Sequence, residues 1–188
     1  IQEKTSDIFK QIVKDNRKTI MRKMDSFPTQ MQTKLKAALQ ESNLSKKERM
    51  ELLAIECGVP SGDLTGVAPV ETLIRRALLE KAAQGENIDA LIGQMPDELS
   101  ALKAFGELVS LASKDTSVNE LEKKLVSLSS DNLKQIEQMF SGEDFPATDK
   151  SMGVLMKLSQ ACKNIDTTIK EISRLKGEQR ALKKIIKK

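Results

Sequence analysis

The stretch that decides the fold is residues 149–188, DKSMGVLMKLSQACKNIDTTIKEISRLKGEQRALKKIIKK. Its apolar residues recur in alternating steps of three and four, which is the spacing of one face of an α-helix. These residues are Leu155, Leu158, Cys162, Ile165, Ile169 and Ile172. We predict one helix from about Asp149 to the chain end, about 55 Å long at ~1.5 Å per residue.

The same alternating steps are those of a coiled-coil seam, although the run is shorter than three heptads. The pattern slips at Leu175 and resumes at Leu182, Ile185 and Ile186, and Gly177 marks a candidate kink between them. Two interpretations stay open. The seam packs within its own bundle, or it pairs with another chain.

Upstream of this helix, helical periodicity continues through nearly the whole chain, and no segment alternates as a strand does. The first helix is expected from Thr5 or Ser6 to Pro28. Ser45 with Glu48, and Ser117 with Glu120, have the spacing of capping boxes that begin two later helices. Residues 58–69 and 141–149 are rich in loop-forming residues.

These signals predict an all-α protein, a multi-helix bundle of about seven to nine helices that ends in the long C-terminal helix. A chain of 188 residues favours one domain. We expect residues 1–148 to form the helical bundle. Residues 149–188 then form the amphipathic helix with a basic end, packed on that bundle.

Charge is unevenly distributed along the chain. The net charge is +4, with 31 Lys and Arg against 27 Asp and Glu. Residues 1–36 carry nine basic and four acidic residues, and residues 170–188 carry eight and two. The middle carries 14 basic and 21 acidic residues. Both ends are therefore basic around an acidic middle.

Basic residues recur every four positions near both ends, which places each set on one helix face. Like charges at this spacing destabilise an isolated helix slightly, so they favour an acidic partner. That partner is either the acidic middle of the chain or an external protein, phosphate or anionic lipid; ordinary solvated helix faces are the alternative. The candidate partner-binding residues are Lys10, Lys14, Lys18, Arg22, Lys176, Arg180, Lys184 and Lys188.

Catalytic chemistry has few residues to draw on. The chain has no His, which removes the commonest general base near neutral pH and the Ser-His and Cys-His pairs. Cys57 and Cys162 are expected to be buried or half-buried free thiols, and a disulfide between them is the alternative. No catalytic, cofactor-binding or metal-binding residue is therefore predicted, and the chain is not expected to be an enzyme. Arg75 and Arg76 are expected to pair with Glu71 or Glu80, and a trans-acting arginine is the alternative.

Base stacking is also disfavoured, because the chain has no Trp or Tyr and only five Phe. Any nucleic-acid binding is then expected to be directed at the backbone and to depend on salt. No uncharged run reaches the ~18 residues of a transmembrane segment. We expect a soluble chain, either cytoplasmic or secreted into a host cytoplasm.

The leading functional hypothesis is a non-enzymatic helical module for protein–protein interaction or scaffolding, which holds another protein or itself through the last helix. The composition is compatible with secreted bacterial virulence proteins and with viral assembly proteins. One alternative is binding of nucleic acid or an anionic membrane through the basic stripes. Another is an effector that regulates a partner enzyme.

Overall fold

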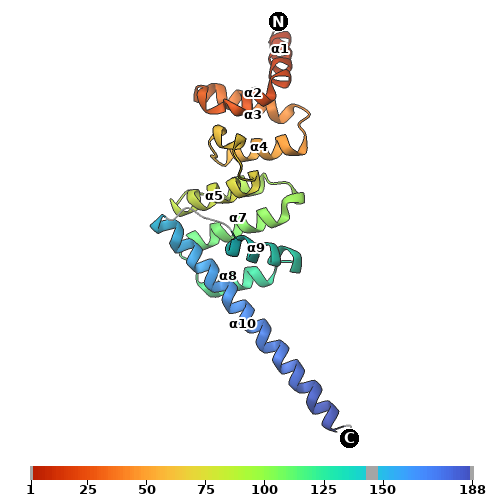
Figure 1. Cartoon of the computed structure of the whole chain (residues 1–188). Helices are drawn as coiled ribbons and strands as arrows, with labels where there is room; N and C mark the ends of the chain where they lie inside the picture. The colour runs from red at the N-terminus through yellow and green to blue at the C-terminus, as the bar shows by residue number, and fades with distance from the viewer. Residues whose placement is uncertain (1, 143–147, 187–188) are drawn as a thin grey trace. The chain divides into compact units, whose positions relative to one another are not determined.

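The computed structural model describes residues 2–142 and 148–186 (Figure 1). This part of the chain contains ten α-helices, three short 3-10 helices and no strand. The predicted all-α class is confirmed, and so is the long C-terminal helix. The chain forms two compact units, Ile1–Leu78 with Gly93–Met95 and Leu79–Ile92 with Pro96–Lys188.

The first unit is built mainly from four helices and two 3-10 helices. Helix α1 packs on α2 and α3, and α4 packs on α2 and α3. The elements are α1 (Gln2–Asp15), α2 (Arg17–Arg22), η1 (Met24–Ser26), α3 (Thr29–Glu41), α4 (Lys46–Glu56), η2 (Ser61–Thr65) and the start of α5 (Val70–Ala83). Their shared core contains Val13, Ile20, Met21, Met24, Leu35, Ala38, Leu39, Leu52 and Ile55.

The first predicted helix, which was expected to reach Pro28, is divided into α1, α2 and the 3-10 helix η1, and its first break falls at Asn16. This residue has φ −115° and ψ 19°, outside the helical region. Its side-chain amide donates to the Ile12 carbonyl at 2.8 Å. An Asn side chain that satisfies a nearby carbonyl competes with regular helix continuation. Because α2 begins anew at Arg17, the apolar spacing across the break does not describe one straight helix face.

The ends of helix α4 agree with their prediction. The Ser45 hydroxyl accepts from the Glu48 N–H, and the Glu48 carboxylate accepts from the Ser45 N–H, which confirms the capping box. Gly58 follows the helix with φ +96°, a conformation that glycine adopts without strain. The predicted loop 58–69 is more ordered than expected, because η2 forms inside it and packs on α2. The Ser61 N–H donates to Asp25 Oδ2 at 2.7 Å and helps to hold it there.

The second unit is arranged around α7, which contacts α8, α9 and α10. Its further elements are the end of α5, most of α6 (Asp89–Gly93), η3 (Asp97–Leu99), α7 (Ser100–Ser113), α8 (Val118–Val126), α9 (Ser130–Gly142) and α10 (Asp149–Ile186). The core side chains are fully buried and include Phe105, Leu108, Leu121, Leu125, Ile136 and Leu158. The Phe105 and Phe140 rings lie 5.9 Å apart between α7 and α9. Most of the predicted loop 141–149, residues 143–147, lies outside the described residues.

Candidate functional site: the exposed half of helix α10

Helix α10 is one helix of 38 residues with two different environments. In its first part, residues 151–165, the side chains of Leu158, Ala161, Cys162 and Ile165 are buried. This part packs on α8 and α7 of the same unit. Figure 1 shows α10 continuing past these helices toward the C-terminus. We call residues 151–165 the packed half and residues 166–186 the exposed half.

Polar contacts hold the packed half in place. The Asn164 amide donates to Glu122 Oε1 of α8 at 2.6 Å. The Lys157 ammonium lies 3.4 Å from the carbonyl oxygens of Lys114 and Thr116, which connect α7 to α8. These bonds fix the axial position of α10, and burial of the apolar side chains supplies the main attraction.

An acidic pair lies where α10 leaves the other helices. Burial and the neighbouring Asp166 carboxylate raise the pKa of Glu137 on α9 above its ordinary value. The same surroundings act on Cys162, since burial, Glu137 and Asp166 raise the pKa of its thiol to about 11. Cys162 is therefore a neutral thiol near pH 7 and a poor nucleophile. Both cysteines are buried thiols, as predicted.

From residue 166 to residue 186 every side chain of α10 is exposed. Apolar exposure is unusually concentrated here, because six of the large exposed hydrophobic residues belong to this half. They are Ile169 (49%), Ile172 (48%), Leu175 (47%), Leu182 (57%), Ile185 (69%) and Ile186 (81%). Scattered surface hydrophobics are normal in proteins, whereas six large ones on one helix segment are a concentration that needs an explanation.

The predicted seam is packed in its first part and exposed in its second part. Leu158, Cys162 and Ile165 pack inside the second unit, whereas Ile169 and Ile172 are exposed. The 3-and-4 spacing is the same on both sides of this boundary, because one helix supplies both parts. Internal packing is therefore observed for the first part, and pairing with another chain stays a hypothesis for the second.

The predicted basic residues at the C-terminal end lie on this exposed half. Lys176, Arg180 and Lys184 are all exposed. Lys188 lies outside the described residues. Near them, the Arg174 guanidinium donates to Glu178 Oε1 at 2.6 Å and also bonds Glu171. The exposed half therefore carries both signs of charge in a defined arrangement.

The predicted basic residues at the N-terminal end do not share one helix. Lys10 and Lys14 belong to α1, whereas Lys18 and Arg22 belong to α2 beyond the break at Asn16. All four are exposed. Lys10 pairs with Glu41 of α3 at 2.9 Å, which raises the pKa of its ammonium. One member of this set thus has a partner from the acidic middle of the chain.

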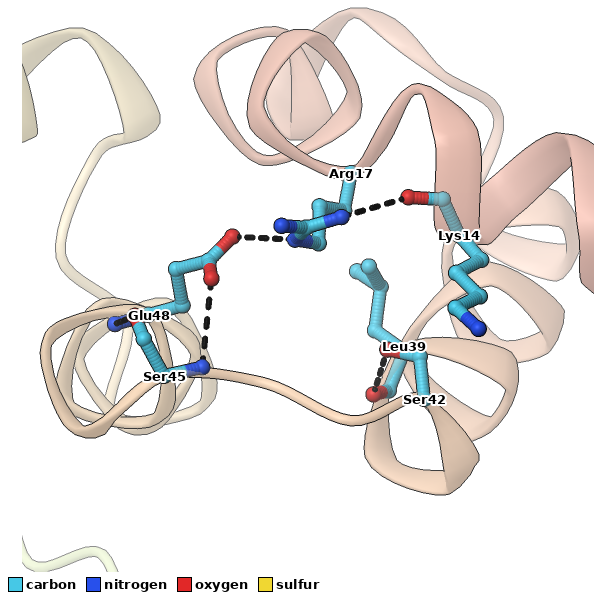
Figure 2. Close-up of polar contacts among 6 residues, drawn as sticks. All are labelled: Lys14, Arg17, Leu39, Ser42, Ser45 and Glu48. Atoms are coloured by element: carbon cyan, nitrogen blue, oxygen red, sulfur yellow. Dashed lines mark hydrogen bonds and ion pairs between the residues drawn. The ribbon is translucent and has the colours of Figure 1, made fainter.

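Arg17 is another basic residue with an acidic partner, and sequence reasoning missed it. Its side chain is less exposed than that of Lys10. Figure 2 shows its guanidinium pointing at the Glu48 carboxylate, with the Nε and Oε2 atoms 2.6 Å apart. Arg17 also donates to the Lys14 carbonyl at 3.0 Å. Burial raises the pKa of the Glu48 carboxyl, but hydrogen bonds from Ser45 and the Arg17 cation outweigh burial and lower it overall. This cluster joins α2 to α4 and has a structural role.

A shallow pocket in the second unit has a volume of about 290 Å³ and is lined mainly by charged and polar side chains of α6, α7 and α8. Its charges compensate one another. Lys124 pairs with Glu107 at 2.7 Å, and Lys114 lies 3.8 Å from Asp89. The Ser110 hydroxyl donates to Asp89 at 3.0 Å. The pocket thus offers a ligand little uncompensated charge.

Arg75 does not have the exposure that a trans-acting arginine needs. Its side chain is 8% exposed, and its guanidinium lies 3.7 Å from the Glu71 carboxylate one turn earlier. The predicted pairing with Glu71 is therefore observed. Among the described residues there is no group of three or more His, Cys, Asp or Glu side chains placed to hold a metal ion.

Within the same described residues, no helix has both the length and the apolar character that crossing a membrane requires.

Comparison with known proteins found no family model, no curated protein and no solved structure that matches the chain.

Proposed function

We propose that the chain is a non-enzymatic helical module for protein–protein interaction, and that the exposed half of α10 is its binding surface. The observation that supports this proposal is the group of six large apolar side chains on a helix segment beyond the packing of its own unit. Full burial of such a side chain is worth roughly 1.5–3 kcal/mol. Because these six are between 47% and 81% exposed, covering each of them is favourable by a part of that value.

The construction of α10 supports the same proposal. The packed half anchors the helix through buried side chains and through Asn164 and Lys157. A helix that is already nucleated presents its free end at a small entropic cost, unlike a peptide that must fold on binding. The bundle thus acts as a scaffold for the exposed half.

The proposal is tested by replacing Leu175 and Leu182 with Asp in the full chain. We expect this double variant to lose self-association in light scattering and partner capture in pull-down. A matched control, Ser173→Asp with Ala181→Asp, adds the same charge on the other side of the helix and should keep both. Removal of residues 170–188 should reproduce the loss. Unchanged association in both altered proteins would contradict the proposal.

A second candidate function is binding of a polyanion or an anionic membrane. The observation that favours it is the exposure of Lys176, Arg180 and Lys184, one per helix turn. Such binding releases counterions from the polyanion, and this release becomes less favourable as the salt concentration rises. The affinity therefore falls steeply with added salt. Lys176→Glu with Lys184→Glu should weaken this binding. An affinity for duplex DNA or anionic vesicles that is the same at low and high salt would rule it out.

A further inference from the structure

The exposed half of α10 contains a second apolar register that differs from the seam of the packed half. Ile172, Leu175, Gln179, Leu182 and Ile186 follow one another in steps of three, four, three and four. All five are exposed. The packed seam also reaches Ile172 by alternating steps, but its next step would fall on Lys176. The register therefore changes at Ile172, and the new seam begins where the contacts with α7 and α8 have ended.

The residue types in this register are those of a two-stranded parallel coiled coil. With Ile172 at heptad position a, the a positions are Ile172, Gln179 and Ile186, and the d positions are Leu175 and Leu182. Isoleucine at a with leucine at d favours two parallel strands. A polar Asn or Lys at one a position specifies the register and the number of strands at some loss of stability, and Gln179 is the polar residue at the central a position here.

The flanking charges fit the same arrangement. In this register Glu171 and Glu178 occupy g positions, and Lys176 and Lys183 occupy e positions. In a parallel pair each g residue faces the e residue five positions later on the other helix. Glu171 then meets Lys176 of the second helix, and Glu178 meets Lys183. Both contacts occur twice by symmetry.

An antiparallel pair of the same helices is disfavoured by the same charges. There g positions face g positions and e positions face e positions, so Glu would meet Glu and Lys would meet Lys. The other basic residues of the exposed half do not oppose the parallel pair. Arg180 and Lys184 occupy b and f positions, which point away from the partner. Arg174, at c, holds Glu171 and Glu178 along the g edge of its own helix.

We propose that the occupant of this surface is a second copy of the chain, and that residues 171–186 of two copies form a parallel, in-register, two-stranded coiled coil. This inference rests on the proposed function and names its partner. About two heptads are short for a coiled coil, but each helix is already formed by its packed half. We therefore expect a reversible dimer whose population rises with protein concentration.

The test uses sedimentation equilibrium of the full chain over a wide concentration range, with two charge-reversed variants. One is Glu171→Lys with Glu178→Lys, and the other is Lys176→Glu with Lys183→Glu. Each alone places like charges at all four contacts and should dimerise at least tenfold more weakly than the wild type. An equimolar mixture should recover dimers, because every contact again joins opposite charges. Helical content, measured by circular dichroism, should be equal in all samples.

The direction of the pair is tested by disulfide formation. In a parallel pair Ile172→Cys places two thiols opposite each other, so oxidation should yield a covalent dimer. Lys184→Cys, on the outward face, serves as the control and should yield far less, as should the wild type. Equal cross-linking at both positions, or none at position 172, would overturn the parallel arrangement.

The results also separate this inference from the proposed function. A wild-type chain that stays monomeric at every concentration, or a mixture of reversed variants that fails to recover dimers, overturns the second copy as partner. If Leu175→Asp with Leu182→Asp still abolishes capture of another protein in that case, the binding surface stands with a different occupant. If Leu175→Asp with Leu182→Asp changes neither dimerisation nor the capture of another protein, both proposals fail.

Discussion

The ion pair of Arg17 and Glu48 shows how single side chains connect helices in the first unit. Glu48 was recognisable from the sequence as part of a capping box, because Ser45 lies only three residues away. Its pairing with Arg17 was not recognisable, because 31 residues separate the two. Local motifs depend on fixed spacing along the chain, whereas a tertiary ion pair depends on how two helices meet.

Removal of this pair should destabilise the first unit. For Arg17→Met we expect a loss of about 1.5–3 kcal/mol in the free energy of unfolding, the range for a hydrogen bond to a charged group. Urea unfolding at pH 7 measures it. Lys10→Met, which removes the exposed pair with Glu41, is the control and should change stability much less. Equal losses in the two variants would show that burial of Glu48 does not matter.

The lowered pKa of Glu48 adds a dependence on pH. Its folded-state pKa lies below that of the unfolded chain, so its stabilising effect is complete above the ordinary glutamate pKa of about 4.3. It is lost as the pH falls through the lower, folded-state pKa. The stability difference between wild type and Glu48→Gln should therefore be constant near neutral pH and shrink in acid. A difference that grew in acid would contradict this sign.

At the scale of elements, the apolar periodicity of the sequence predicts the helical class. It does not predict where each helix ends, because the ends depend on side-chain contacts. The apolar pattern runs through Asn16 without a signal, yet its side chain ends α1 there. The N-terminal basic stripe was predicted on one face for that reason and is divided between two helices. Gly58, by contrast, was predictable as a cap because few other residues adopt its positive φ.

Helix α10 allows a direct comparison of buried and exposed leucines on one element. Leu158→Ala removes a fully buried side chain and should lower the free energy of unfolding by about 2–5 kcal/mol. Leu182→Ala removes one that is 57% exposed and should change it by no more than about 0.5 kcal/mol in a dilute sample. Chemical denaturation of both variants makes the comparison. Similar losses would mean that residues 166–186 are covered in the isolated chain.

At the scale of the whole molecule, the net charge of +4 hides a division between basic ends and an acidic middle. This division is visible in the sequence itself, because it needs only a count of charged residues segment by segment. Composition does not determine where α10 leaves its unit, since the seam has the same spacing before and after Ile165. The helical register of residues 172–186 can be read from the sequence, but its availability for pairing depends on the contacts of α7 and α8.

Self-association should be visible in the thermal stability of the whole chain. Any equilibrium that involves only the folded state raises the Tm with increasing concentration of the binding partner. We expect the wild-type Tm to rise over a hundredfold increase in protein concentration, because folded chains pair. The Tm of Leu175→Asp with Leu182→Asp should stay constant. Differential scanning calorimetry of both proteins checks this. The same dependence of the Tm on concentration in both proteins would count against pairing through α10.

The continuity of α10 has a mechanical consequence. The 21 residues of its exposed half extend about 30 Å beyond the last buried turn, at ~1.5 Å per residue. Helical backbone joins Ile186 to Leu158 without a break, so a force applied at the far end reaches the bundle as a torque about Ile165. The exposed half is therefore a lever as well as a surface. A load that tilts it must either bend the helix or move Leu158 and Ile165 against α8.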